Sequence, residues 1–197
     1  MGLLSFLQNT PASAALQGDG VTLRAPRMED FKSWRELRLQ SRTFLEPWEP
    51  AWSDSELLRS SFRLRLRRYE ALMESDEAYA FFIFASASED LLGGITLSNV
   101  RRGVSQSATL GYWMGEVHAN QGHMTKALTA LLAFAFTDIN LHRVEAACLP
   151  RNFASIKLLE RSGFRREGYA AAYLKIADQW EDHLLWAKLT PEKSHKQ

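Results

Sequence analysis

Apolar side chains recur along the chain with two kinds of spacing, and each predicts one kind of secondary structure. Repeats of three and four residues are typical of amphipathic helices. They predict helices over 29–40, 54–73, 124–137 and 154–162. Short apolar or alternating runs are typical of strands. They predict strands over 21–24, 79–85, 91–100, 107–115, 144–149, 169–176 and 182–189.

Proline, asparagine, aspartate and glycine mark where these elements begin and end. Pro47 and Pro50 predict an irregular loop over 44–52, because proline interrupts both helices and strands. Aspartate is a favourable first residue for a helix, and asparagine and glycine are favourable where a helix stops. The residues suited to these positions are Asp54, Asn140 and Gly163.

Nothing in the chain indicates a second domain, since it has no internal repeat, no low-complexity tract and no linker. We therefore expect one α+β domain over 19–190, with an N-terminal extension over 1–18 and a polar tail over 191–197. The extension lacks the basic start and the cleavage site of a secretory signal, and Phe6 stands where N-myristoylation needs Ser or Thr. We expect this extension either to fray or to pack on the surface. If it packs on the surface, a contact in a homodimer is one role that it can have.

Composition and charge exclude several classes of protein. The 197 residues are 46% hydrophobic and 24% charged, and 24 basic against 23 acidic side chains leave a net charge of +1. This balance is typical of a globular protein and argues against a bulk nucleic-acid binder. No apolar run approaches the ~20 residues that span a membrane. Cys148 is the only cysteine and no Cys/His metal spacing is present, so we expect a metal-free cytoplasmic protein.

A candidate phosphate-binding unit begins with the predicted strand LGYWMG at 110–115. This strand runs through the polar loop HANQGHM at 118–124 straight into a predicted helix. A helix N-terminus offers an anion unpaired N–H groups and the positive end of the helix dipole. A second strand–loop–helix unit follows at 144–169 and carries PRNFAS, SGF and REGY.

With these two units, the chain resembles the GNAT superfamily of acetyl-CoA-dependent N-acetyltransferases. Within it, the chain is similar to the bacterial enzymes that acetylate the N-terminal alanine or serine of ribosomal proteins. The resemblance runs from Val21 to Leu189 and is carried by FLEPWEP, LGYWMG, HRVEAACLPRNFAS, ERSGFRREGY and YLKIADQWEDH. It implies a mixed, mainly antiparallel sheet flanked by helices, with a V-shaped splay between the strands at 110–115 and 144–149. It also implies direct transfer, in a ternary complex, of an acetyl group from acetyl-CoA to a protein N-terminus.

The resemblance also assigns roles to residues beside the splay. The CoA pyrophosphate would be held by backbone amides at Gln121, Gly122, His123, Met124 and Thr125. A backbone N–H near Met114 would stabilise the developing oxyanion, and Asn152 would contact the pantetheine arm. Ser155 would assist departure of the thiolate, because Leu159 stands where many members of the superfamily have a tyrosine acid. The structural alternative is that Ser155 only caps or solvates the helix start.

The chain departs from the superfamily pattern in the phosphate loop. Ala119 stands where Gln or Arg is usual, and Asn120 stands where Gly is common. Because backbone amides hold the phosphates, we expect these changes to weaken CoA binding rather than abolish it.

The general base is less evident from the sequence, and that favours an N-terminal amine as the acceptor. Neutralising an α-amine at pH 7 costs about 1.4 kcal/mol, against about 4.6 kcal/mol for a lysine side chain. Glu116 is the leading candidate for the base or for a water relay. An acidic and aromatic pocket for the amine is predicted from Glu46, Trp48, Glu49 and Tyr112.

Three alternatives remain open. The acceptor could be a small amine, such as an antibiotic or a polyamine. The chain could instead be a non-catalytic module that binds CoA or a partner, since Ala119 and Asn120 depart from the pattern. The arginines of 59–68 could bind RNA, although a charge run on an amphipathic helix is usually a solvated face.

Overall fold

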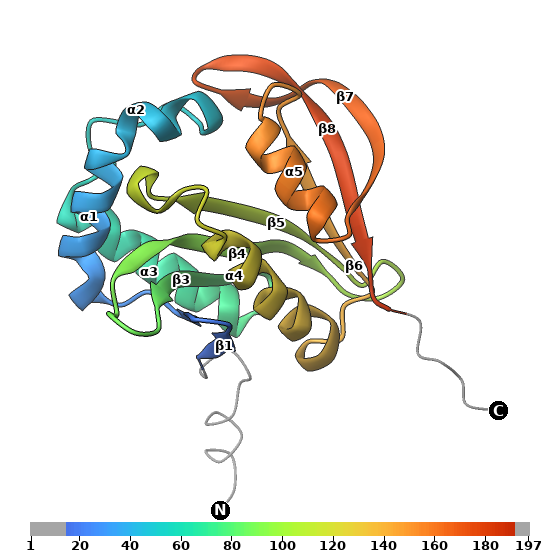
Figure 1. The fold of residues 1–197 in the computed structure, drawn as a ribbon, viewed down its shortest axis with the longest axis horizontal. Helices are drawn as coiled ribbons and strands as arrows, with labels where there is room; N and C mark the ends of the chain where they lie inside the picture. The colour runs from blue at the N-terminus through green and yellow to red at the C-terminus, as the bar shows by residue number, and fades with distance from the viewer. Residues whose placement is uncertain (1–14, 192–197) are drawn as a thin grey trace, which may run out of the picture.

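The computed structural model describes residues 15–191, which form one mixed sheet of eight strands with helices on both faces (Figure 1). The strands are β1 (Leu16–Gly18), β2 (Val21–Arg24), β3 (Tyr79–Ala85), β4 (Leu91–Arg101), β5 (Ser107–Met114), β6 (Arg143–Cys148), β7 (Arg165–Ile176) and β8 (Gln179–Leu189). They lie in the order β1-β2-β3-β4-β5-β6-β8-β7. The helices are α1 (Phe31–Gln40), α2 (Arg42–Leu45), α3 (Arg59–Glu74), α4 (His123–Ala133) and α5 (Phe153–Arg161).

The sheet opens between β5 and β6. These two strands run parallel, whereas all other neighbouring strands within residues 15–191 are antiparallel. Their pairing ends at Leu110 and Ala146, although β5 continues to Met114 and β6 to Cys148. The strands therefore separate toward their carboxyl ends, which confirms the predicted mixed sheet and its splay.

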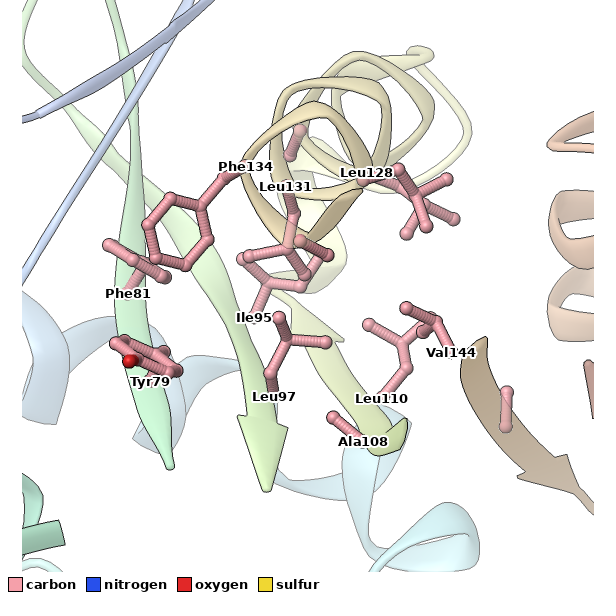
Figure 2. Close-up of a cluster of buried hydrophobic side chains, with 14 of the residues drawn as sticks. Tyr79, Phe81, Ile95, Leu97, Ala108, Leu110, Leu128, Leu131, Phe134 and Val144 are labelled. Atoms are coloured by element: carbon pink, nitrogen blue, oxygen red, sulfur yellow. The ribbon is translucent and has the colours of Figure 1, made fainter. Parts of the chain in front are cut away.

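Each face of the sheet has its own core. On one face, α4 and α5 cover a large apolar cluster, to which Leu128 and Leu131 of α4 and Ala108 and Leu110 of β5 contribute (Figure 2). On the other face, α1 and α3 pack on a smaller aromatic cluster around Phe62. Because side chains alternate between the faces of a strand, both clusters follow directly from the apolar strand patterns.

The segment predicted as an irregular loop over 44–52 is partly helical, so that prediction was wrong. It contains the end of α2 and a 3₁₀ turn over Glu46–Trp48. Pro47 fits there because proline is tolerated in the first turn of a helix, where its missing N–H would be unpaired anyway. This short helical segment carries the chain from α1 toward the pocket described below.

Other helix ends differ from the predictions in detail. The N-cap of α3 is Leu58 and not Asp54, because turns precede the helix. The helix predicted over 124–137 changes at Ala133 into one π-helical turn, Phe134–Asp138. Asn140 and Gly163 have left-handed φ angles of 52° and 79°, which confirms that both follow the ends of helices as predicted.

The edges of the sheet extend further than predicted. Strand β1 lies within the predicted extension, where Gly18 pairs with Val21 of β2. The last two strands also begin earlier than predicted, β7 at Arg165 and β8 at Gln179. The rest of the predicted extension, 1–14, and residues 192–197 of the predicted tail lie outside the described residues. None of the helices between residues 15 and 191 has both the length and the apolar character to cross a membrane.

Candidate active site

The end of β5 presents a backbone donor to the opening in the sheet. Met114 pairs with Gly93 of β4, and the adjacent hydrogen bond runs from Gly115 N to Leu92 O. N–H groups alternate in direction along a strand, so the Met114 N–H points away from β4 and toward β6. Because β6 no longer pairs with β5 at this height, this N–H faces the gap between the strands.

Two hydroxyl groups meet beside the same gap. Tyr112 of β5 and Ser155 in the first turn of α5 share a hydrogen bond, and Ser155 is 8% exposed. Burial raises the pKa of Tyr112 to about 12, and the hydrogen bond between Tyr112 and Ser155 opposes this only in part. The phenol therefore keeps its proton near neutral pH. Cys148 is buried nearby, as predicted, and its burial raises the pKa of the thiol.

Asn152 caps the N-terminus of α5, so the Ser155 hydroxyl is not used for capping. The Asn152 Oδ1 accepts a hydrogen bond from Ser155 N at 3.0 Å, which is the usual N-cap interaction. Asn152, not Ser155, therefore caps the helix. Leu159, which stands in place of the family's tyrosine, is fully buried in the core.

The loop that leads into α4 contains two left-handed residues. Asn120 has a φ of 59° and Gly122 a φ of 82°. Asparagine adopts this conformation more readily than other non-glycine residues, so Asn120 preserves the backbone path that a glycine would take. The side chain of Gln121 is exposed and donates to Val117 O at 2.8 Å. The helix begins at His123, and the N–H groups of its first turn have no acceptor within the helix.

A pocket of about 380 Å³ opens on the opposite face of the sheet, against the same stretch of β5. Gly94 and Gly111 line it from the strands, and three tryptophans, Trp34, Trp52 and Trp113, line it from the sides. A Cβ at Gly94 would collide with the indole of Trp113, so the glycine allows this ring to lie close against β4. The pocket and the hydroxyl pair thus lie on the two faces of one opening.

One wall of the pocket is a tightly connected group around Arg38. Its Nη1 and Nη2 donate to the two carboxylate oxygens of Glu49 at 2.6 and 2.7 Å, and Trp52 Nε1 donates to the same carboxylate at 2.8 Å. The guanidinium also lies over the rings of Trp52 and Trp113, at 4.2 and 5.0 Å from their centres. Arg38 is only 5% exposed, so its charge is balanced almost entirely by Glu49.

A second ion pair, between Arg65 and Glu56, lines the pocket from α3 and the segment before it. The Arg65 guanidinium lies 5.4 Å from the centre of the Trp34 ring.

Neither Arg38 nor Arg65 was predicted as a site residue. The sequence did contain a signal for both arginines, because each lies on the apolar stripe of its helix. Arg38 follows Trp34 by four residues, and Arg65 follows Phe62 by three.

The predicted amine-binding residues separate into two groups. Glu49 and Tyr112 are among the residues that line the pocket, although the Tyr112 hydroxyl lies with Ser155 on the opposite face, and Glu46 and Trp48 do not line it. Glu46 instead forms an exposed ion pair with Arg42 at 2.6 Å. The acidic character predicted for this loop is therefore largely neutralised by arginines.

Glu116, the predicted base, lies in a 3₁₀ turn directly after β5. Its side chain is exposed, and its backbone N–H donates to Ser41 Oγ at 2.9 Å. Between residues 15 and 191, no three His, Cys, Asp or Glu side chains are grouped as ligands of a metal would be.

Comparison with known proteins connects this arrangement to one family. The family model described as an acetyltransferase (GNAT) domain matches residues 21–165. A probable N-acetyltransferase of Bacillus subtilis, YjcK, is 34% identical over 90% of this chain and 98% of its own length. The ribosomal protein uS5-alanine N-acetyltransferase of Escherichia coli is 33% identical over 96% of this chain and 97% of its own. The structure of Mycobacterium smegmatis RimJ in complex with CoA-disulfide superposes with a TM-score of 0.84 at 33% identity, over 92% of this chain and 88% of that one.

Proposed function

Because the chain belongs to the GNAT family of acetyltransferases, we propose that it transfers the acetyl group of acetyl-CoA to the α-amine of a protein N-terminus. The acceptor is a ribosomal protein that begins with Ala or Ser, and its nitrogen attacks the thioester directly in a ternary complex. The similarity to a uS5-alanine N-acetyltransferase over nearly the whole chain supports this class of acceptor.

The observation that carries the proposal is that β5, where it separates from β6, has candidate reacting groups on one face of the sheet and a pocket on the other. On the α4/α5 face, the Met114 N–H and the Tyr112–Ser155 pair border the opening. On the α1/α3 face lies the pocket of about 380 Å³. Two reactants that enter from opposite faces can meet without a covalent acyl-enzyme.

Acetyl-CoA would lie on the α4/α5 face. The residues that would hold its pyrophosphate are the backbone amides of Gln121, Gly122, His123, Met124 and Thr125, at the start of α4. The left-handed conformation of Asn120 supports this role, because the loop keeps a glycine-like path in spite of the substitution. Asn152 uses its Oδ1 to cap α5, which leaves its amide N–H groups to contact the pantetheine arm.

The chemistry follows from the groups at the opening. The amine nitrogen bonds to the acetyl carbon, and the Met114 N–H stabilises the negative charge that develops on the carbonyl oxygen. The carbon–sulfur bond then breaks, and the Ser155 hydroxyl, hydrogen-bonded to Tyr112, donates to the departing sulfur. A thiol has a pKa of about 8.5, so a hydroxyl hydrogen bond is sufficient help for this leaving group.

The charges of the pocket favour a peptide over a polyamine. Its two carboxylates, Glu49 and Glu56, are each paired with an arginine, Arg38 and Arg65. A polyamine carries several positive charges and needs unpaired carboxylates to replace its hydration. A peptide N-terminus brings one amine and neutral backbone groups, which suit a pocket of paired charges and tryptophan rings.

The test is an acetylation assay with purified protein, acetyl-CoA and a panel of acceptors. The panel contains peptides with the N-terminal sequences of ribosomal proteins that begin with Ala or Ser, the same peptides with a blocked N-terminus and an internal lysine, and spermidine. We expect acetylation of the free N-terminus only, located by mass spectrometry. Faster acetylation of spermidine, or of the blocked peptides, would contradict the proposal.

Initial-velocity kinetics test the direct attack separately. A ternary complex predicts double-reciprocal lines that intersect when the acceptor concentration is varied at several concentrations of acetyl-CoA. Parallel lines would indicate an acyl-enzyme and exclude the proposed order of events.

A further inference from the structure

His183 is a buried titratable side chain that the mechanism above leaves unused. It lies on β8 within the YLKIADQWEDH motif and is 3% exposed. Its Nδ1 lies 2.9 Å from the backbone oxygen of Glu181. A carbonyl oxygen can only accept, so this hydrogen bond assigns the proton of the neutral ring to Nδ1 and leaves a lone pair on Nε2.

The strand register places His183 at the height of the opening. In the parallel ladder, continuing the offset of Leu110 and Ala146 brings Trp113 level with Leu149. In the antiparallel ladder, Cys148 pairs with Leu184, so the next step brings Leu149 level with His183. His183 therefore lies at the level of Trp113, where β5 and β6 have already separated.

The alternation of side chains places His183 on the pocket's side of the sheet. Cys148 and Leu184 belong to the core under α4 and α5, so their neighbours Leu149 and His183 belong to the opposite face. Trp113 packs on that same opposite face and lines the pocket. The imidazole thus lies on the same face and at the same level of the sheet as Trp113, one of the residues that line the pocket.

The β7–β8 hairpin that carries His183 is connected to the pocket wall. At its turn, Ala177 N donates to the backbone oxygen of Glu49 at 3.0 Å. Glu49 is the carboxylate that pairs with Arg38 in the wall. Figure 1 shows the turn of this hairpin reaching over the sheet toward α2.

The charged and titratable groups around the ring leave Nε2 without a competing partner in the described structure. Tyr173 of β7 packs its ring against the imidazole, with the ring centres 5.8 Å apart. A hydrogen bond from Arg151 lowers the pKa of Glu181, and a hydrogen bond from Tyr169 lowers the pKa of Asp182. Both carboxylates are therefore anionic near neutral pH and already hydrogen-bonded to other partners.

We propose that His183 Nε2 accepts, through one bridging water, the proton that the acceptor nitrogen loses as its bond to the acetyl carbon forms. The imidazolium then returns this proton to solvent, while the departing sulfur takes a proton from the Tyr112–Ser155 pair, which solvent replaces. Protons lost and gained balance, and the products are the acetylated N-terminus and CoA. This inference rests on the proposed function, and it competes with Glu116, whose exposed side chain lies on the turn after β5.

The test compares His183→Gln with Glu116→Gln and with His142→Gln, a control that removes an exposed imidazole at the start of β6. The readout is kcat/KM for a peptide beginning with Ala, measured across pH, together with the acetyl-CoA Kd by calorimetry. We expect His183→Gln to lower kcat/KM roughly 10²-fold near neutral pH, with the acetyl-CoA Kd unchanged. The control keeps wild-type values.

The shape of the pH profile separates a base from a structural residue. In the wild type, both the amine and the imidazole have to be neutral, so activity falls with two protonations as the pH decreases. In His183→Gln only the amine protonation remains, and the acid limb becomes less steep. A loss of activity with an unchanged profile, or a flattened profile in Glu116→Gln instead, overturns the inference. A wild type that acetylates no peptide overturns the proposed function itself.

Discussion

The two faces of the sheet contribute to the site in different ways. On the α4/α5 face, the groups proposed to meet acetyl-CoA are backbone N–H groups and two hydroxyls, those of Tyr112 and Ser155. On the α1/α3 face, the pocket is built from charged side chains paired among tryptophans, as in the Arg38–Glu49 pair. The first face tolerates substitutions that keep the backbone path, whereas the second depends on particular side chains and their partners.

The strongest test of this contrast is Arg38→Ala. The change leaves the Glu49 carboxylate without its main partner in a largely buried position. We expect the free energy of unfolding to decrease by about 3–5 kcal/mol, measured by chemical denaturation. Arg42→Ala is the matched control, because it breaks the exposed pair with Glu46 and should cost under ~0.5 kcal/mol. Equal decreases in the free energy of unfolding of the two variants would show that the Arg38–Glu49 pair stabilises the fold no more than an exposed ion pair does.

Ser155→Ala tests the hydroxyl pair on the other face. We expect kcat to fall about 10²-fold, equivalent to about 2.7 kcal/mol, with an unchanged acetyl-CoA Kd and normal thermal unfolding. Tyr112→Phe shows which hydroxyl donates, since the phenol keeps its proton near neutral pH. If Ser155→Ala turns over at the wild-type rate, Ser155 has no part in the departure of the thiolate.

Asn120 tests whether the phosphate loop acts through its backbone. Alanine is disfavoured at the left-handed φ of 59°, by roughly 1–2 kcal/mol, whereas glycine is not. We therefore expect Asn120→Ala to weaken acetyl-CoA binding up to about tenfold and Asn120→Gly to preserve it, by calorimetry. Weakening of similar size in both variants would mean that the Asn120 side chain itself contacts the ligand.

Much of the α4/α5 face was predictable because its signals are local. The apolar run of β5, the polar loop and the start of α4 are consecutive in sequence, and the resemblance to GNAT enzymes is carried by the same stretch. The loop substitution at Asn120 raised an expectation of weak CoA binding. Its left-handed φ removes part of the reason for that expectation, because asparagine can take the place of glycine there.

The pocket on the α1/α3 face was only partly predictable. The FLEPWEP loop was expected to be acidic and irregular, but its Glu49 pairs with Arg38, eleven residues earlier and on another helix. Arg65 was counted among solvated arginines, although it shares the apolar stripe of α3 with Phe62 and Tyr69. An arginine on the buried stripe of a helix is the pattern that would have identified both residues.

By itself, the sequence determined the order and type of the main elements, because apolar spacing along each segment sets which face it buries. Its motifs also identified the acetyltransferase family. Tertiary structure alone decided which charges neutralise one another across the pocket and which hydroxyl partners Ser155. It also decided that His183 shares a level with Trp113 on the far side of the opening. These relations depend on the register between strands and the packing of distant helices, and no local spacing encodes either.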